Sequence, residues 1–201
     1  MPKFSNSGTG TKRPDMKTNL GKFDNSAYRP GRPAVIRALW YLTNAVFFIN
    51  PLFPFSGIKV LLLRLFGAKI GRCAVVKPGV NIKYPWRLRA GDHCWIGERV
   101  WIDNLADVEI KNHVCISQGV YLLTGNHDYK KPAFDLITDP ILLEDGVWIG
   151  AKSIVCPGVC GHSHAVLCAG SVATKSLDAF GIYQGNPAVK IRDREFVTRH
   201  S

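Results

Sequence analysis

Apolar residues return at every sixth position along most of the chain between residues 70 and 173. The register is plainest near its end, where it takes in Leu143, Ile149, Val155, Gly161, Leu167 and Ala173. A period of six is neither that of a helix nor that of a simple strand. It predicts a parallel β-helix, in which each face of a triangular coil takes one hexapeptide and the aliphatic residue fills the interior.

The register forms five triplets, and three hexapeptides close one turn. The earlier triplets are Ile70, Val76 and Ile82, then Ala90, Ile96 and Ile102, then Ile110, Ile116 and Leu122. Equivalent positions in these three are 20 residues apart instead of 18, which predicts small bulges at a corner. A longer break separates Leu122 from Leu143. A β-sandwich is the alternative, but two-residue alternation does not keep a six-residue register for this long.

The residues before the repeat predict a helical preface over 37–67. No charged residue occurs from Ala38 to Gly57, a length at which a transmembrane helix has to be considered. Pro51 and Pro54 argue against one, since they divide the segment into a helix over 38–49 and a second helix that ends at Gly67. We expect these helices to cap the open end of the β-helix or to contact another subunit. The alternative is that 38–66 rests on the inner membrane surface, where lipid-linked sugars reside.

Positive charge is concentrated at the start of the chain. Residues 1–37 carry eight Lys or Arg against two Asp, a balance of +6 within a net charge of +11. Because Ser, Asn, Gly and Pro are also frequent there, we predict that 1–36 is a mobile or surface-wrapping arm. Nucleic-acid binding is not expected, since no known nucleic-acid-binding signature accompanies the charge. The remaining segments are the repeat, 68–185, with a protruding loop over 124–142, and a C-terminal segment, 186–201.

Six cysteines lie in the repeat region, and none forms a Cys-x-x-Cys pair. Small repeat positions tolerate a free thiol. Because no secretory signal precedes them, we expect a reduced, cytoplasmic compartment and no disulfides.

The loop that interrupts the repeat is where we expect chemistry, because a loop leaving a rigid coil can reach a neighbouring surface. It contains His127, an imidazole that can accept a proton from a hydroxyl about to attack an acyl carbon. Asp128 or another carboxylate would orient it. The chain lacks a nucleophile elbow, a phosphate-binding loop and a dinucleotide fingerprint. This inventory favours direct transfer from a bound acyl donor.

Several motifs in order carry a resemblance to a known family. They are the hexapeptide register, Thr-Gly-Asn-His-Asp-Tyr at 124–129, Val-Trp-Ile-Gly-Ala at 147–151, Pro-Gly-Val at 157–159, Ala-Gly-Ser-Val at 169–172 and Gly-Asn-Pro-Ala at 185–188. Together they resemble the left-handed β-helix acyltransferases, and within these the colanic acid biosynthesis acetyltransferase group. The resemblance runs from about Arg37 to Arg194.

The resemblance implies an all-β, left-handed parallel β-helix of about five coils and an acetyl-CoA-dependent O-acetyltransferase that assembles as a homotrimer. It places His127 at the catalytic position. It implies donor-binding roles for Trp148, Ala151, Ala169, Thr174 and Lys175, and for Lys190 and Arg192 toward the coenzyme phosphates. The expected acceptor is a hydroxyl of a free or lipid-linked sugar in an exopolysaccharide or related glycan, and no metal is required.

Two places depart from the regular pattern. Gly161 stands where the family usually has Ile, which loosens one interior position. Asp103 and Asn104 break the aliphatic pattern on the coil before the loop, and we predict that they face the acceptor sugar.

Two other classes of protein stay open. His93 and His113 are 20 residues apart at equivalent coil positions, so we expect them to stack on one outer face. With His127 they would form a three-His zinc site like that of the β-helical carbonic anhydrases. The other class is a non-catalytic trimeric scaffold. The Trp148 segment and the Gly-Asn-Pro-Ala turn favour coenzyme A.

Overall fold

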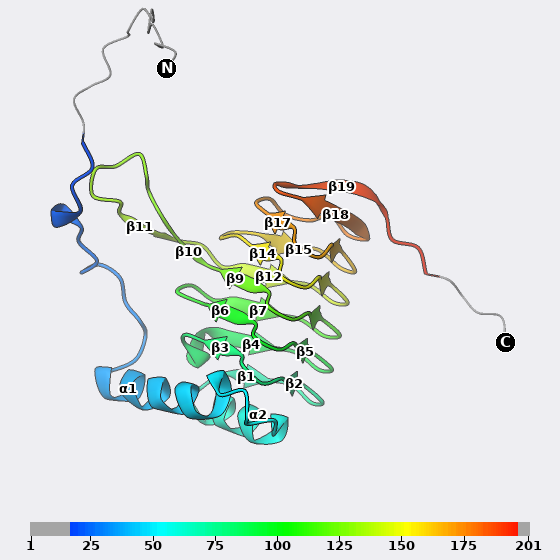
Figure 1. Cartoon of the computed structure of the whole chain (residues 1–201), viewed down its shortest axis with the longest axis horizontal. Coiled ribbons are helices and arrows are strands. Elements are labelled where there is room, and N and C mark those ends of the chain that lie inside the picture. Colours follow the sequence, from blue (N-terminus) through cyan, green and yellow to red (C-terminus); the bar gives the residue numbers. More distant parts are fainter. Residues whose placement is uncertain (1–16, 197–201) are drawn as a thin grey trace, which may run out of the picture.

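The computed structural model describes residues 17–196 and shows a parallel β-helix with helices at one end (Figure 1). Each coil contributes one short strand to each of three sheets, which we name A, B and C in chain order. Sheet A contains β1 (Lys69–Ile70), β4 (Leu88–Ala90), β7 (Val108–Ile110), β12 (Ile141–Leu143) and β15 (Cys160–Gly161). Sheet B contains β2 (Val75–Val76), β5 (Trp95–Ile96), β8 (Cys115–Ile116), β13 (Trp148–Ile149), β16 (Val166–Leu167), β18 (Gly181–Gly185) and β19 (Ala188–Asp193). Sheet C contains β3 (Asn81–Ile82), β6 (Trp101–Asp103), β9 (Tyr121–Leu123), β14 (Ile154–Val155) and β17 (Val172–Ala173).

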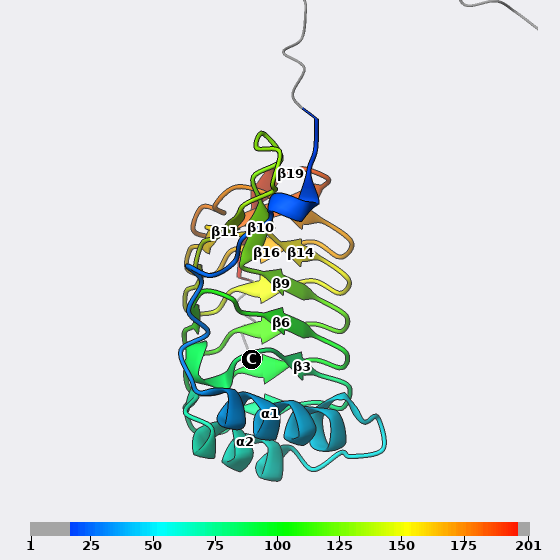
Figure 2. The same cartoon turned by 90° about the vertical axis from the view of Figure 1, so that its left-hand side faces the viewer.

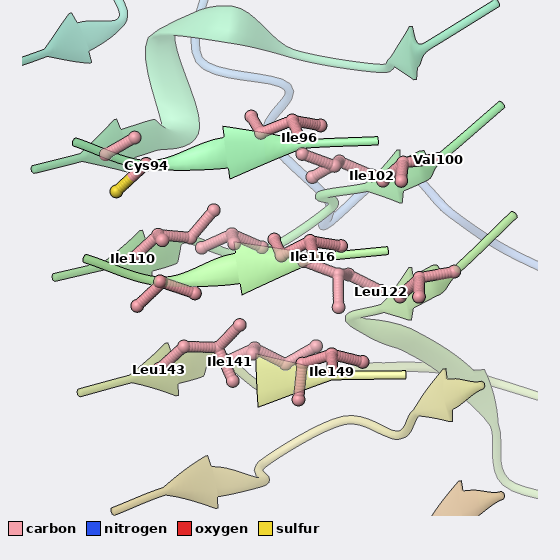
Figure 3. Packing of buried hydrophobic residues seen from close by; sticks show 14 of the residues in the cluster. Cys94, Ile96, Val100, Ile102, Ile110, Ile116, Leu122, Ile141, Leu143 and Ile149 are labelled. Carbon is pink, nitrogen blue, oxygen red and sulfur yellow. The ribbon is translucent and has the colours of Figure 1, made fainter. Parts of the chain in front are cut away.

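The six-residue register is the interior of the coils. All fifteen predicted register positions are buried, and like residues of successive coils lie above one another (Figure 3). Ile96 pairs with Ile116, and Ile116 with Ile149, in a single ladder of sheet B. The predicted β-helix is confirmed. β18 adds a strand beyond the fifth coil, so the solenoid makes about six turns rather than five.

Helices close the N-terminal end of the β-helix, as predicted. They are α1 (Ala34–Thr43), the π-helix η2 (Asn44–Ile49) and α2 (Ser56–Leu65). Trp40 and Phe48 are buried edge to face with ring centroids 5.1 Å apart, and Trp40 Nε1 donates to the carbonyl of Ile82 at 2.8 Å. The helices therefore bury the apolar face that the first coil leaves open.

The outer face of these helices is also apolar. Exposed apolar side chains on the helices and the loop between them are Val35, Ile36, Leu39, Tyr41, Leu42, Val46, Ile49, Leu52, Phe55, Ile58, Leu61 and Leu65, of which Tyr41 and Ile49 line a pocket against the coils. No helix in residues 17–196 is both long and apolar enough to cross a membrane. The opposite end of the β-helix carries the antiparallel pair β18 and β19, so the predicted C-terminal segment begins inside this hairpin.

Candidate active site

All interruptions of the repeat fall at one corner of the coil, the corner at which the chain passes from sheet C to sheet A. In the first coil the extra residues form the 3-10 helix η3 (Pro85–Arg87), and in the second they lie between Asp103 and Val108. The third interruption is the long one, between β9 and β12. Since the coils stack, these three insertions lie above one another and form one wall of the molecule, which we call the C–A corner (Figure 1).

The long interruption is an antiparallel hairpin of β10 (Gly125–His127) and β11 (Leu136–Thr138). Its base is fixed by Thr124, whose buried hydroxyl donates to the carbonyl of Asp103 at 2.8 Å and accepts from Ala106 N at 3.0 Å. Next to it, a Cβ on Gly125 would collide with Leu105. The hairpin is thus anchored on the preceding coil, and His127 ends its first strand.

A backbone carbonyl orients the His127 ring. Nδ1 of His127 lies 2.7 Å from the carbonyl oxygen of Phe134, and because a carbonyl can only accept, Nδ1 carries the proton. Nε2 is then the nitrogen with a free lone pair. Phe134 has a φ of 52°, in the left-handed region that residues other than glycine seldom adopt. This turn aims the carbonyl at the imidazole.

Asp128 makes its contacts at the tip of the hairpin, and its predicted orienting role stays a prediction. Its carboxylate accepts from the backbone N of Lys130 at 3.1 Å, and its own backbone N donates to the carbonyl of Asp135 at 2.8 Å. Asp128 therefore closes the tip of the hairpin, while the group that holds the imidazole comes from the other strand.

The described part of the N-terminal arm wraps along the C–A corner (Figure 2). The sequence predicted either a mobile or a surface-wrapping arm, and these residues take the second form. The backbone N of Asn19 donates to the carbonyl of Pro132 at 2.8 Å, at the tip of the hairpin. After the 3-10 helix η1 (Leu20–Lys22), Phe23 packs edge to face on His127, with ring centroids 5.8 Å apart. Residues 1–16 of the predicted arm lie outside the described part of the chain.

A cavity of about 520 Å³ lies between the arm and the hairpin. Its walls are Asp24, Asn25, Ala27, Tyr28 and Arg29 of the arm, Arg87 of η3, and Asp135, Leu136 and Thr138 of the hairpin. Leu136 is the residue that pairs with His127 between the two strands, so the cavity adjoins the histidine.

The predicted donor residues are spread over the β-helix, and the first three lie on sheet B or at the corner that follows it. Trp148 is on sheet B, 47% exposed, and its Nε1 donates to Oγ of Ser117 at 2.9 Å. Ala151 and Ala169 occupy the same corner of consecutive coils, between sheets B and C, and the N of Gly170 donates to the carbonyl of Ala151 there. This B–C corner is at the other end of sheet C from the hairpin that carries His127.

The remaining donor candidates lie toward the C-terminal end. Thr174 and Lys175 are exposed and follow β17 at the C–A corner. Lys190 and Arg192 are exposed on β19. Lys190 forms an ion pair with Asp193 at 2.7 Å, which raises its pKa through the hydrogen bond to that carboxylate and keeps it cationic. The structure does not bring these residues to His127 of the same chain, and their donor roles stay predictions.

The two predicted acceptor residues differ. Asn104 is fully buried, and its side chain bonds the backbone of Tyr84 on both sides, accepting from N at 2.9 Å and donating to O at 2.6 Å. It joins two coils at the C–A corner, a structural role, and its acceptor contact stays a prediction. Asp103 is 8% exposed and pairs with Lys83 at 2.9 Å and with the Tyr121 hydroxyl at 3.1 Å. Its role stays a prediction.

The three-His zinc site does not form. His93 and His113 stack as predicted, with ring centroids 5.1 Å apart and planes 2° apart, but they lie between sheets A and B, away from His127. Among residues 17–196, the one trio of candidate ligand side chains close enough to share an ion is Glu144, Cys160 and His162. Within residues 17–196 of one chain, the three histidines of the carbonic anhydrase alternative are therefore not brought together.

Comparison with known proteins places the chain in a family. No family model matches it. It is 38% identical over 167 residues to the protein named colanic acid biosynthesis acetyltransferase WcaF of Escherichia coli K12, covering 83% of this chain and 91% of that one. The chain belongs to the hexapeptide-repeat acetyltransferases. Galactoside O-acetyltransferase of Escherichia coli is 29% identical over 136 residues, 66% of each chain.

Solved structures agree with this assignment. A hexapeptide-repeat acetyltransferase from Vibrio cholerae matches with a TM-score of 0.73 and 26% identity, over 81% of this chain and 92% of that chain. The same protein complexed with acetyl-CoA matches with a TM-score of 0.72 and 25% identity, over 81% and 88%. The chain is thus an acetyltransferase that uses acetyl-CoA, and the predicted family, enzyme class and co-substrate are confirmed.

Four residues around the candidate site of this hexapeptide-repeat acetyltransferase were not predicted from the sequence: Phe23, Tyr28, Arg87 and Phe134. Each acts through a contact with a residue distant in sequence or through its backbone, which a linear motif does not display. The extra residues in the first coil were the available signal for Arg87, since they marked the corner where the arm docks.

Proposed function

We propose that this enzyme transfers the acetyl group of acetyl-CoA to a hydroxyl of a sugar in an exopolysaccharide or related glycan precursor, with His127 as general base. The orientation of His127 supports this, because its Nδ1–H is held by the Phe134 carbonyl and its Nε2 is left to accept a proton. The names of the relatives, a colanic acid biosynthesis acetyltransferase and a galactoside O-acetyltransferase, support a sugar hydroxyl as acceptor.

The reaction is a direct transfer. Nε2 of His127 takes the proton of the sugar hydroxyl while its oxygen attacks the thioester carbonyl, forming the new C–O bond. The tetrahedral intermediate collapses, the C–S bond breaks, and coenzyme A leaves as a thiolate that takes the proton from the imidazolium. No covalent enzyme intermediate is required.

The experiment that tests this role is replacement of His127 by Asn, which keeps a polar side chain of similar reach. We expect kcat to fall by about 10²–10⁴-fold, the usual contribution of a general base, while acetyl-CoA still binds. Coenzyme A release is measured over a panel of glycan precursors, and mass spectrometry identifies the product. Undiminished transfer by His127→Asn would exclude the base, and products formed only with amino sugars would indicate N-acetylation.

A homotrimer would complete the site. His127 and the predicted donor residues Ala151 and Ala169 stand at opposite ends of sheet C, so a neighbouring copy can bring its B–C corner to this hairpin. Mixed oligomers test the arrangement. We expect His127→Asn and Ala169→Tyr chains, each inactive alone, to regain activity when co-expressed, because some sites then combine two intact surfaces. A monomer by light scattering, or no regain in verified mixed oligomers, would contradict it.

We further propose that the outer face of α1, η2 and α2 rests on an anionic lipid surface. The face is apolar, and residues 25–91 contain eleven Lys or Arg and no Asp or Glu. Apolar helices flanked by cations bind the cytoplasmic leaflet in this way. Leu42→Asn and Leu61→Asn should reduce sedimentation with phosphatidylglycerol vesicles, whereas Val189→Asn, equally exposed at the other end of the β-helix, should not. A change in oligomeric state instead would assign the face to a second copy.

A further inference from the structure

We propose that the cavity between the N-terminal arm and the hairpin binds an anionic group, a phosphate or a carboxylate, of the sugar acceptor. This inference rests on the proposed function and adds to it the chemical class of the acceptor. Nothing in the family motifs points to this cavity, because the arm that forms half of it precedes the repeat.

The cavity is placed to present a sugar to the catalytic base. Asp135 and Leu136 in its wall belong to or adjoin β11, and Leu136 pairs with His127 across the hairpin. On the arm side, Phe23 contacts the His127 ring and immediately precedes Asp24 of the cavity wall. The cavity wall therefore includes the strand partner of His127 and the residue that follows Phe23.

Two arginines in the cavity wall, Arg29 and Arg87, offer N–H donors to an anion. Arg87 donates from Nη2 to the carbonyl of Arg29 at 2.5 Å, while its Nε is buried and has no hydrogen-bond partner among the described residues. The Arg29 guanidinium forms no hydrogen bond or ion pair within residues 17–196. Guanidinium groups with unpaired N–H donors favour a phosphate or carboxylate, which can accept two parallel hydrogen bonds.

The acidic residues in the wall are already engaged. Asp24 accepts from the N and Oγ of Ser26 at 2.7 and 2.9 Å, and Asp135 pairs with Lys131 at 2.8 Å. Neither carboxylate forms an ion pair with Arg29 or Arg87. The Arg87 guanidinium lies over the Tyr28 ring, 5.7 Å from its centroid, which holds it at the cavity wall. Arg29 and Arg87 both lie in a stretch, residues 25–91, that contains no Asp or Glu.

The arm wall is built in and does not depend on a ligand. Three hydrogen bonds join it to the coils: the Tyr28 hydroxyl to the Leu105 carbonyl at 2.8 Å, Trp86 Nε1 to the Pro30 carbonyl at 2.7 Å, and Arg87 to Arg29. Burial raises the pKa of Tyr28 to about 12, so its hydroxyl stays protonated and donates. A preformed site loses less entropy when it binds.

Size and polarity fit one sugar with its charged group. The volume of about 520 Å³ lies within the range of small-molecule pockets. Asn25 and Thr138 add an amide and a hydroxyl to the wall, which suit sugar hydroxyls.

The test compares charged and neutral acceptors. Arg29→Gln and Arg87→Gln are measured with glucose 1-phosphate, UDP-glucose, glucuronic acid and methyl glucoside, beside the control Arg89→Gln, an exposed arginine on sheet A. We expect KM for the anionic acceptors to rise at least about tenfold in both variants, with KM for acetyl-CoA within about twofold. Turnover of methyl glucoside should stay within about twofold in Arg29→Gln, whereas Arg87→Gln also removes a hydrogen bond to the arm and should lower it, though less than it impairs the anionic acceptors. Whether the phosphates or the uronate respond identifies the anion.

Further variants separate this proposal from others. Tyr28→Phe removes an arm contact without removing charge, so it should affect charged and neutral acceptors alike. Equal losses on all acceptors in the arginine variants, or the same loss in Arg89→Gln, would overturn the anion site. If no acceptor is acetylated by the wild type, the proposed function fails. Calorimetry with glucose 1-phosphate then still tests the cavity, and binding undiminished by Arg29→Gln would overturn it.

Discussion

The carbonyl oxygen of Phe134 accepts a hydrogen bond from Nδ1 of His127 across 2.7 Å. The two residues are seven positions apart and belong to opposite sides of one hairpin. This contact fixes the tautomer of the imidazole, and with it the nitrogen that can act on a substrate.

The conformation of Phe134 should matter more than its side chain. Phe134→Gly keeps the carbonyl and allows a φ of 52°, so we expect activity within about threefold of the wild type. Phe134→Pro forces φ to about −65° and removes an N–H, which turns the carbonyl away and should lower kcat at least tenfold. Steady-state kinetics compare the two. Equal losses in both would show that the phenyl ring, not the carbonyl, is required.

Replacing Asp128 by Asn distinguishes a carboxylate orienter from a carbonyl orienter. Asn can still accept from the N of Lys130, so the turn at the tip of the hairpin should persist. We expect kcat and its pH profile to stay within about twofold of the wild type. A loss near that of His127→Asn would restore Asp128 to the catalytic site.

At Gly161 the neighbouring side chains fill the interior space that a larger residue would occupy. A Cβ there would lie 3.2 Å from Leu143 Cδ2 and 3.5 Å from Val147 Cγ1. Gly161→Ile should therefore overpack the interior and lower the free energy of unfolding by about 1–3 kcal/mol. Adding Leu143→Val should recover part of the loss, as measured by urea denaturation. Simple additivity of the two losses would show that the residues do not share this space.

Lys59 should give the stability a pH dependence in the alkaline range. It is buried, its Nζ donates to the Lys77 carbonyl at 3.0 Å, and burial together with the Lys77 charge lowers its pKa below 10.5. Between that lowered pKa and 10.5 the unfolded chain binds a proton that the folded chain does not, so the free energy of unfolding rises with pH. Lys59→Met removes this contribution.

The Lys59 measurement is a difference between two proteins. The stability of the wild type minus that of Lys59→Met, from urea denaturation at several pH values, should increase as the pH approaches 10.5. Other lysines cancel in this comparison. A difference independent of pH would mean that the folded and unfolded states share one pKa at this site.

Metal removal should leave the reaction intact. His93 and His113 stack between sheets A and B, away from His127 of the same chain. We expect activity within about twofold after dialysis against a chelator and in His113→Gln. Loss of activity on chelation, with recovery when zinc is added, would instead support a zinc-dependent enzyme.

The hexapeptide period was enough to predict fifteen interior positions, because a residue in register points into the coil. The same reasoning found His127 as the polar residue in the longest break. It did not find the orienter, since neighbours in sequence pointed to Asp128 while antiparallel pairing brings the Phe134 carbonyl to the ring. The docking of the arm could not be predicted either, because the Tyr28 hydroxyl donates to the carbonyl of Leu105, which is 77 positions away in the sequence.

The stacking of all insertions at the C–A corner separates the parts of this enzyme that can vary from those that cannot. Two corners repeat in strict register, with six residues from one interior position to the next in every coil. The third corner carries η3, the hairpin and the docked arm outside the ladders. A chain that exchanged only these pieces would keep its scaffold and its predicted donor corner while acquiring a different acceptor.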